Sequence, residues 1–246
     1  SAPNTLGTQM KATGEVMGIG SNLEECLLKG IRSLETGANH IYHSKFDNMT
    51  VEELLDYIKV FRSDNLFAIA ELFYHGVALE TIHEITQITP YFLEAIQRII
   101  DMEETLRKKV MDLPALTDAK KMGFSDKYVA KLWNCTELEV YNFRKANNLF
   151  PVFKMVDTCH TGAYIPYFYS TYTGENASRL TDKKKIVVLG AGPIRIGQGV
   201  EFDYSTVHAV MTIKNAGYEA IIINNNPETV STDYTTADKL YFEPLT

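Results

Sequence analysis

Apolar positions in residues 21–150 recur every three or four residues, which is the spacing of amphipathic helices. The first predicted helix follows Ser21, and its apolar stripe comprises Leu23, Leu27, Ile31 and Leu34. A longer helix is predicted from Pro90, with an inward stripe of Phe92, Ile96, Ile99 and Ile100. This part of the chain is therefore predicted to consist of many short helices packed on one another.

Polar residues mark where several of these helices begin and end. Ser21–Glu24, Thr50–Glu53 and Thr136–Glu139 each place a hydroxyl three residues before an acid, the spacing of a capping box. Thr89 precedes a proline, which favours the first position of a helix.

Two glycines and a lapse in the pattern indicate breaks. Gly76 and Gly123 stand where helix C-termini are expected, because glycine adopts the left-handed conformation freely. Between Glu35 and Thr50 the helical pattern lapses, which predicts a linker or a long loop.

From residue 150 the pattern is typical of strands. Residues 150–156 are predicted to be extended, and the tyrosine-rich residues 161–175 to form a connection that lies on other surfaces, with rings that pack rather than bind bases. Apolar runs at 185–190, 219–227 and 240–244 predict parallel strands. The predicted fold class is mixed, an all-α helical part followed by the start of an α/β doubly wound sheet.

Composition excludes several classes of protein. The chain has 246 residues, 45% of them hydrophobic, and a formal net charge of -7, which disfavours binding to nucleic acid or to an anionic membrane. No apolar run approaches the ~20 residues of a membrane span, and the N-terminus lacks the pattern of a signal peptide. Cys26, Cys135 and Cys159 lie far apart, which disfavours a disulfide framework or a zinc site and indicates a cytoplasmic protein.

A glycine-rich loop follows the first predicted parallel strand, at residues 190–199. It is similar to a dinucleotide-binding turn, but Arg195 replaces the third glycine, and Asn224–Asn226 stand where the ribose-binding acid is expected. An NAD or FAD site is therefore disfavoured. The loop could bind an anion through backbone N–H groups or serve as a tight turn, and the sequence leaves both open.

Four acidic residues follow the carboxyl ends of predicted strands, where open α/β sheets bind ligands: Glu201, Asp203, Glu228 and Asp233. They could bind a metal or take part in acid–base chemistry. Because no general base is evident beside them, structural roles as helix caps and loop anchors are favoured.

Residues 82–96 and 129–143 form an internal repeat with a constant offset of 47 residues. Each is predicted to be a short helix, a tight turn with a threonine cap and a second helix, which is a helix-turn-helix pattern. The second helices carry equal numbers of acids and bases, so counterion release would contribute little to DNA binding. We expect the hairpins to pack on each other or on a partner subunit.

Both ends of the chain are expected to be cut from a longer polypeptide. The third predicted parallel strand ends close to Thr246, and residues 5–20 have no evident strand partner of their own.

Several strings give the chain a resemblance to a known family. Residues 190–209 (GAGPIRIGQGVEFDYSTVHA) and 224–246 (NNNPETVSTDYTTADKLYFEPLT) resemble the opening of the second synthetase half of the carbamoyl-phosphate synthase large subunit. Residues 10–20 resemble the last segment of its first half, and PVFKMVDTC and YFYSTY resemble the join between the halves. One departure is visible at residues 160–164, where the connector looks shortened.

The resemblance implies an internal fragment with three parts. Residues 1–37 would be the C-terminal tail of the carboxyphosphate half, 38–182 the helical oligomerisation domain with its connector, and 183–246 the pre-ATP-grasp, Rossmann-like subdomain of the carbamoyl-phosphate half. The parent would be an ATP-dependent ligase that makes carbamoyl phosphate from bicarbonate, glutamine-derived ammonia and two ATP for arginine and pyrimidine synthesis. ATP, magnesium and potassium would serve the parent, and a glutaminase small subunit would be its partner.

The resemblance also implies that the isolated chain self-associates and holds no catalytic, cofactor-binding or metal-binding residue, so it is not expected to hydrolyse ATP. Carbamate would move through an interior passage, which we expect to be lined by Gly197, Gln198, Gly199 and Glu201. Lys11 and Glu15 would border the first site or lie on the surface. The alternative is a free-standing helix-turn-helix or nucleotide-binding regulator, which the acidic charge and Arg195 disfavour.

Overall fold

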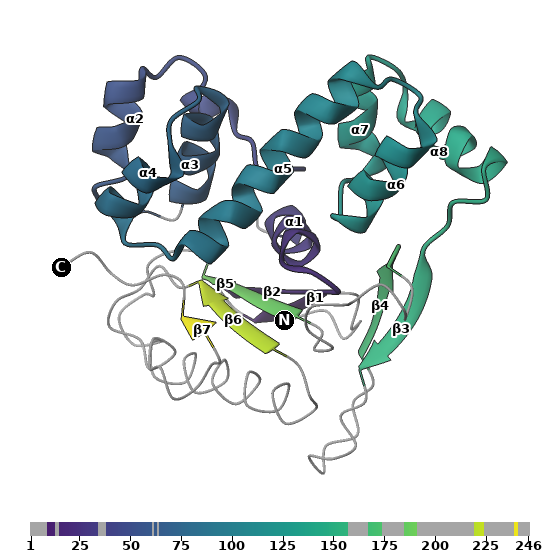
Figure 1. The fold of residues 1–246 in the computed structure, drawn as a ribbon. Coiled ribbons are helices and arrows are strands. Elements are labelled where there is room, and N and C mark those ends of the chain that lie inside the picture. The colour runs from purple at the N-terminus through teal and green to yellow at the C-terminus, as the bar shows by residue number, and fades with distance from the viewer. Residues whose placement is uncertain are drawn as a thin grey trace, which may run out of the picture.

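The computed structural model places helices on one side of the molecule and strands on the other (Figure 1). It describes residues 9–12, 15–33, 38–60, 62, 64–156, 167–173, 185–190, 219–223 and 239–240. Helix α1 (Leu23–Ser33) lies between the other helices and the larger sheet. The predicted mixed fold class, a helical part followed by the beginning of an α/β sheet, is confirmed.

The described residues of the helical part form eight α-helices and one short 3₁₀ helix. After α1 come η1 (Ser44–Phe46), α2 (Val51–Tyr57), α3 (Asn65–Tyr74), α4 (Leu79–Thr86), α5 (Pro90–Lys108), α6 (Leu113–Lys121), α7 (Asp126–Trp133) and α8 (Glu137–Ala146). Helix α5 has 19 residues and runs through the centre of this part, in contact with α1, α3, α4, α6 and α7 (Figure 1). The predicted series of short helices is thus present.

Two of the predicted helix starts are confirmed. Thr50 forms a complete capping box with Glu53, because its hydroxyl accepts the Glu53 N–H at 3.1 Å while the Glu53 carboxylate accepts the Thr50 N–H at 3.4 Å. The hydroxyl of Thr136 accepts the N–H of Glu139 at 3.1 Å at the start of α8.

The cap predicted at Ser21 is wrong, and the cap predicted at Thr89 is confirmed in position only. The side chain of Asn22 caps α1 in place of Ser21, since its oxygen accepts the Glu25 N–H at 2.8 Å. Thr89 forms no side-chain cap bond before α5, and its hydroxyl is buried. The proline after Thr89 does occupy the start of the helix as predicted. The Ser21 hydroxyl lies 3.4 Å from the Thr171 hydroxyl, so a tertiary contact decides where this side chain turns.

The predicted helix ends at Gly76 and Gly123 are confirmed, with φ angles of 78° and 92°.

The two units of the internal repeat also have the same turn conformation between their helices. Gln87 and Asn134 are 47 positions apart, and both end the first helix of their unit in the left-handed conformation, with φ angles of 58° and 56°. The two units therefore form the same helix–turn–helix hairpin.

The predicted apolar stripes are buried wherever their side chains are described. Leu23, Leu27 and Ile31 of α1 are at most 2% exposed, and the four stripe residues of α5 are at most 7% exposed. Leu34 lies outside the described residues.

The segment between α1 and α2 is irregular as predicted, but it is more than a linker. Ile41 and Phe46 are fully buried, and His40 is 1% exposed. This segment therefore contributes to the core of the helical part.

Helix α1 is buried around its whole circumference, since every residue from 23 to 31 is buried. Its charged side chains are therefore paired. Glu24 forms an ion pair with Arg98 of α5, and Glu25 with Lys29 at 2.8 Å. Arg32 donates to the carbonyl of Gly123 at 2.7 Å. A helix buried in this way requires such partners, because an unpaired buried charge is strongly destabilising.

The larger sheet has the order β1-β2-β5-β6-β7. Its strands are β1 (Gln9–Ala12), β2 (Glu15–Gly20), β5 (Lys185–Gly190), β6 (Glu219–Ile223) and β7 (Lys239–Leu240). The last three are parallel, as predicted.

The expectation that residues 5–20 have no strand partner is wrong. Strands β1 and β2 form a hairpin, and β2 pairs antiparallel with β5, so that Ile19 lies opposite Ile186. Backbone hydrogen bonds to a strand some 165 positions away in sequence are a tertiary effect that local patterning does not reveal.

Strands β3 (Val152–Val156) and β4 (Tyr167–Thr171) form a separate antiparallel pair. The end of β4 lies against α1, as predicted for a connection that covers other surfaces. The Thr171 hydroxyl donates to Glu25 at 2.9 Å, and the Lys29 ammonium donates to the carbonyl of Ser170. The ring of Tyr172 lies 5.0 Å from the Lys120 ammonium, so its aromatic face packs on α6.

We expect Gly123→Ala to lower the free energy of unfolding by about 2–4 kcal/mol, from left-handed strain and overpacking together. A Cβ there would lie 2.9 Å from the backbone Cα of Glu25, at a φ angle of 92°. Gly76→Ala is the matched control, since Gly76 has a φ angle of 78° but no atom within 4 Å of the added Cβ. It should lose only about 1–2 kcal/mol. Denaturant unfolding of both variants measures this, and equal losses would contradict the close approach of α1.

Candidate functional site

The predicted passage residues Gly197, Gln198, Gly199 and Glu201 lie outside the described residues, as do Asp203, Glu228 and Asp233. The backbones of the two residues expected near the first site are described. Lys11 lies on β1 opposite Val16, and Glu15 lies on β2 opposite Gly190, the first glycine of the glycine-rich loop. The fold thus brings Glu15 beside the start of that loop.

Among the described side chains, no group of three histidine, cysteine, aspartate or glutamate residues is placed to hold a metal ion. The helices of this same portion are each too short or too polar to cross a membrane.

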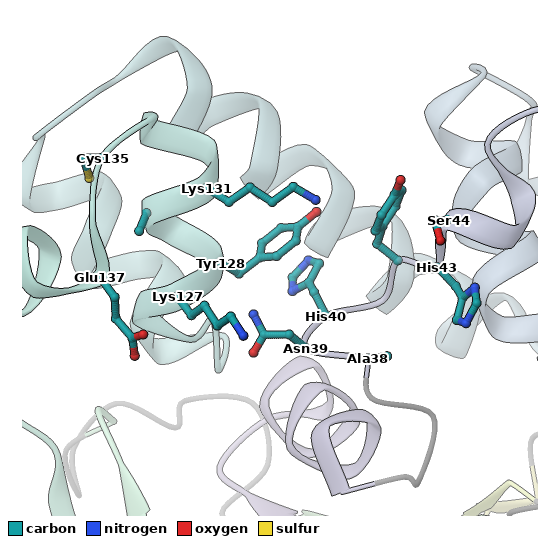
Figure 2. Close-up of a pocket in the computed structure, with 12 residues that line it drawn as sticks. Ala38, Asn39, His40, His43, Ser44, Lys127, Tyr128, Lys131, Cys135 and Glu137 are labelled. Atoms are coloured by element: carbon teal, nitrogen blue, oxygen red, sulfur yellow. The ribbon is translucent and has the colours of Figure 1, made fainter.

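The helical part contains a pocket of about 620 Å³ between the segment 38–44 and helix α7. Figure 2 shows Lys127, Tyr128 and Lys131 of α7 on one side, with Asn39, His40 and Ser44 facing them. Glu137, at the start of α8, completes the rim. The ammonium of Lys131 lies 4.5 Å from the ring centre of Tyr42, so that a cation–π contact spans the pocket.

The floor of this pocket is a buried polar cluster around His40. The imidazole stacks on Tyr128 with ring centres 3.8 Å apart, and its Nε2 lies 2.7 Å from the carboxylate of Glu103 on α5. Tyr74 of α3 donates its hydroxyl to the same carboxylate at 2.8 Å. The cluster thus joins the segment after α1 to α3, α5 and α7.

Burial lowers the pKa of His40 even though Glu103 opposes this shift, so the imidazole is neutral at pH 7. Burial and the neighbouring Glu103 charge raise the pKa of Tyr74, which keeps that hydroxyl protonated as a donor. The cluster is consistent with a structural role, because His40 and Glu103 are buried and the cluster joins four separate elements.

Cys135 lines the same pocket, and its thiol is not activated. Burial and the nearby Glu139 carboxylate raise the pKa of Cys135, whereas nucleophilic cysteines have a lowered pKa. The pocket therefore lacks the signature of covalent catalysis at this cysteine.

A second buried cluster ties α6, α7 and α8 together. Asp126 accepts from Arg144 at 2.7 Å and lies 3.1 Å from the Lys120 ammonium. Burial raises the pKa of this carboxyl, but the bonds from Arg144 and the charge of Lys120 outweigh it and hold the pKa below its usual range. Burial lowers the pKa of Lys120 to about 8. Arg144 lies 18 residues after Asp126 and on a different helix, and no local spacing rule links such residues. The sequence alone therefore did not reveal this cluster.

The large apolar side chains that remain exposed in the described helical part gather towards its C-terminal end. After α5 they are Val110, Met111, Leu138, Tyr141, Phe150, Val152 and Phe153. In the internal repeat, Val140 and Phe143 correspond to buried residues of α5. Leu138 and Tyr141 lie on a different face of α8 from Val140 and Phe143. That difference of face is the sequence signal that could have identified them.

The helix-turn-helix geometry of the two repeat units gives no support to DNA binding. The first turn of α8, where a recognition helix would meet bases, carries Glu137 and Glu139. Both are exposed, and they would repel phosphates.

Comparison with protein families finds two matches. Residues 15–148 match the oligomerisation domain of the carbamoyl-phosphate synthetase large chain. Residues 182–246 match the preATP-grasp domain of carbamoyl phosphate synthase. The first match covers the hairpin strand β2 and the eight α-helices of the described residues.

The buried imidazole makes a testable contribution to the pH dependence of stability. Because the pKa of His40 is lowered on folding, the unfolded chain takes up a proton below about pH 6.5 that the folded chain excludes. The free energy of unfolding should therefore fall from pH 7.5 to 5.5, with this residue contributing at most about 1.4 kcal/mol per pH unit.

His40→Gln keeps a polar side chain but cannot titrate, so its unfolding free energy should depend less steeply on pH. Tyr128→Phe alters the same cluster without removing a group that titrates in this range, and it should keep the original slope. Denaturant unfolding at several pH values measures both variants. Identical slopes for His40→Gln and the original chain would contradict a neutral buried imidazole.

Proposed function

Because the chain belongs to the family of carbamoyl-phosphate synthetase large chains, we propose that its helical part holds copies of the large chain together. The observation that carries this proposal is the match of residues 15–148, more than half of the chain, to the family's oligomerisation domain. The exposed apolar side chains after α5 support it, since such residues on a folded surface mark places of association.

We propose that the parent protein is an ATP-dependent ligase of the cytoplasm that makes carbamoyl phosphate for arginine and pyrimidine synthesis. One synthetase half would phosphorylate bicarbonate, ammonia from a glutaminase small subunit would convert the product to carbamate, and the other half would phosphorylate carbamate. The strands β5, β6 and β7 would belong to the opening of that second half, in agreement with the match of residues 182–246.

In this proposal the isolated chain does not catalyse the reaction. The family matches support this, because they cover the oligomerisation domain and the preATP-grasp domain of the large chain. ATP, magnesium and potassium would be held by other parts of the parent. The division of the chain at residues 38 and 183 remains a prediction, although α1 shares the core of the later helices.

We further propose that Gly197, Gln198, Gly199 and Glu201 line the carbamate passage of the parent. Glycines leave room for a small solute, and backbone N–H groups stabilise an anion. The register that sets Glu15 opposite Gly190 supports a location close to the end of the first half, since the loop begins beside that residue.

Self-association of the isolated chain should be visible as a molar mass that rises with concentration. Light scattering across a concentration series is expected to give a dimer or a larger species at the upper end. A monomeric mass throughout the series would contradict the proposed role.

In the complete enzyme, Gly199→Phe should obstruct the passage. Synthesis of carbamoyl phosphate should fall at least tenfold, while bicarbonate-dependent ATP hydrolysis by the first half should stay near its original rate. Assays of the two partial reactions measure this separately. An equal loss of both would count against the passage and indicate a folding defect.

A further inference from the structure

The outward side of helix α8 carries two exposed apolar side chains next to each other. Leu138 is 64% exposed and Tyr141 is 42% exposed, and their spacing of three residues places them on one face of the helix. The opposite face holds the buried residues Val140 and Arg144. Leu138 and Tyr141 line one shallow groove, together with Asp126, Thr136 and Glu137.

The groove is fixed from beneath by the buried ion pairs. Asp126 is neutralised by Arg144 and Lys120, so it adds no free charge to the surface. The Arg144 guanidinium also lies 5.4 Å from the ring centre of Tyr141, which favours a defined position for that ring. An apolar surface on a rigid support is suited to docking, because little side-chain entropy is lost on binding.

The remaining charges of α8 are arranged with opposite signs at its two ends. Glu137 and Glu139 lie in the first turn, and Lys145 lies in the last turn. All three are exposed, and none forms an ion pair with a described residue. The helix therefore presents an acidic end, an apolar middle and a basic end on its free surface.

We propose that α8 packs against α8 of a second copy of this chain, antiparallel and about a two-fold axis. A two-fold axis brings the same patch of both copies together, so the patch must complement itself. Antiparallel packing places Glu137 of each copy near Lys145 of the other and opposes the two helix dipoles favourably. The side chains of Leu138 and Tyr141 are then buried away from water in the middle of the contact.

This pairing rests on the proposed self-association and states where it occurs. Charge decides between the possible partners. An acidic segment would be repelled by Glu137 and Glu139, and a basic segment would be repelled by Lys145. A second α8 in the reverse direction places opposite charges together at both ends. Phosphate backbones are disfavoured for the same reason.

The size of the contact predicts its strength. Helix α8 has 10 residues and is therefore about 15 Å long, which is too short to bury the ~1,200–2,000 Å² of a standard stable interface by itself. Phe150 lies four residues beyond the helix, within about 15 Å along the chain, and it can enlarge the apolar area. The association should accordingly be weak and strongly dependent on concentration.

Charge exchange along α8 tests the direction of packing. Glu137→Lys and Lys145→Glu should each weaken association at least threefold by sedimentation equilibrium, because each places like charges opposite one another. The double variant should regain most of the original affinity, since the opposite signs are restored across the axis. Failure of the double variant to recover, in a chain that folds and associates, would overturn the antiparallel pairing.

Leu138→Glu tests the apolar middle and should weaken association at least tenfold. Val60→Glu is the matched control, since Val60 is also exposed, at 54%, but lies beyond the end of α2. It should leave association unchanged. Equal effects of the two variants would overturn the pairing while leaving the proposed self-association intact. An original chain that stays monomeric would overturn both.

Asn142→Cys provides a test that does not depend on weakening the contact. Asn142 is exposed and adjoins Tyr141, the midpoint between Glu137 and Lys145, so the Asn142 positions of two copies would meet close to the axis. Mild oxidation should join the variant into a disulfide-linked dimer, and Val60→Cys should not be joined. Failure of Asn142→Cys to cross-link, or equal cross-linking of both variants, would contradict the pairing.

Discussion

The burial of α1 on all sides is the constraint on which the arrangement of the molecule depends. Its apolar residues face α5 on one side and strands β2 and β5 on another. Its charges must then be neutralised within the protein, and their partners come from α5, from β4 and from the turn at Gly123. Helices and strands are joined here by polar contacts that hold only when all of these elements are in place.

The internal repeat shows how one hairpin can serve two purposes. In the first unit, the second helix extends to 19 residues and becomes the central support of the helical part. In the second unit it has 10 residues, with one side buried and the other carrying Leu138 and Tyr141. The same local geometry thus gives a core element in one place and a free surface in the other. That difference connects the fold to the proposed association of subunits.

Less of the candidate site than of the fold could be predicted from the sequence. The apolar stripes of α1 and α5, the helix ends at Gly76 and Gly123 and the box at Thr50 follow from local periodicity and capping chemistry. The His40–Glu103 and Asp126–Arg144 pairs join residues far apart in sequence, and no local pattern indicates that they meet. The position of Glu15 opposite Gly190 depends in the same way on a strand pairing.

The sequence by itself determined the helices, the parallel strands, their order and the family, because these depend on side chains within a few turns and on long specific strings. Tertiary structure decided the rest. It replaced Ser21 by Asn22 as the cap of α1, drew His40 and Ile41 of an apparent linker into the core, and gave β2 a partner in β5. In each case the deciding free energy came from burial against distant elements, which outweighs the smaller preferences of the local chain.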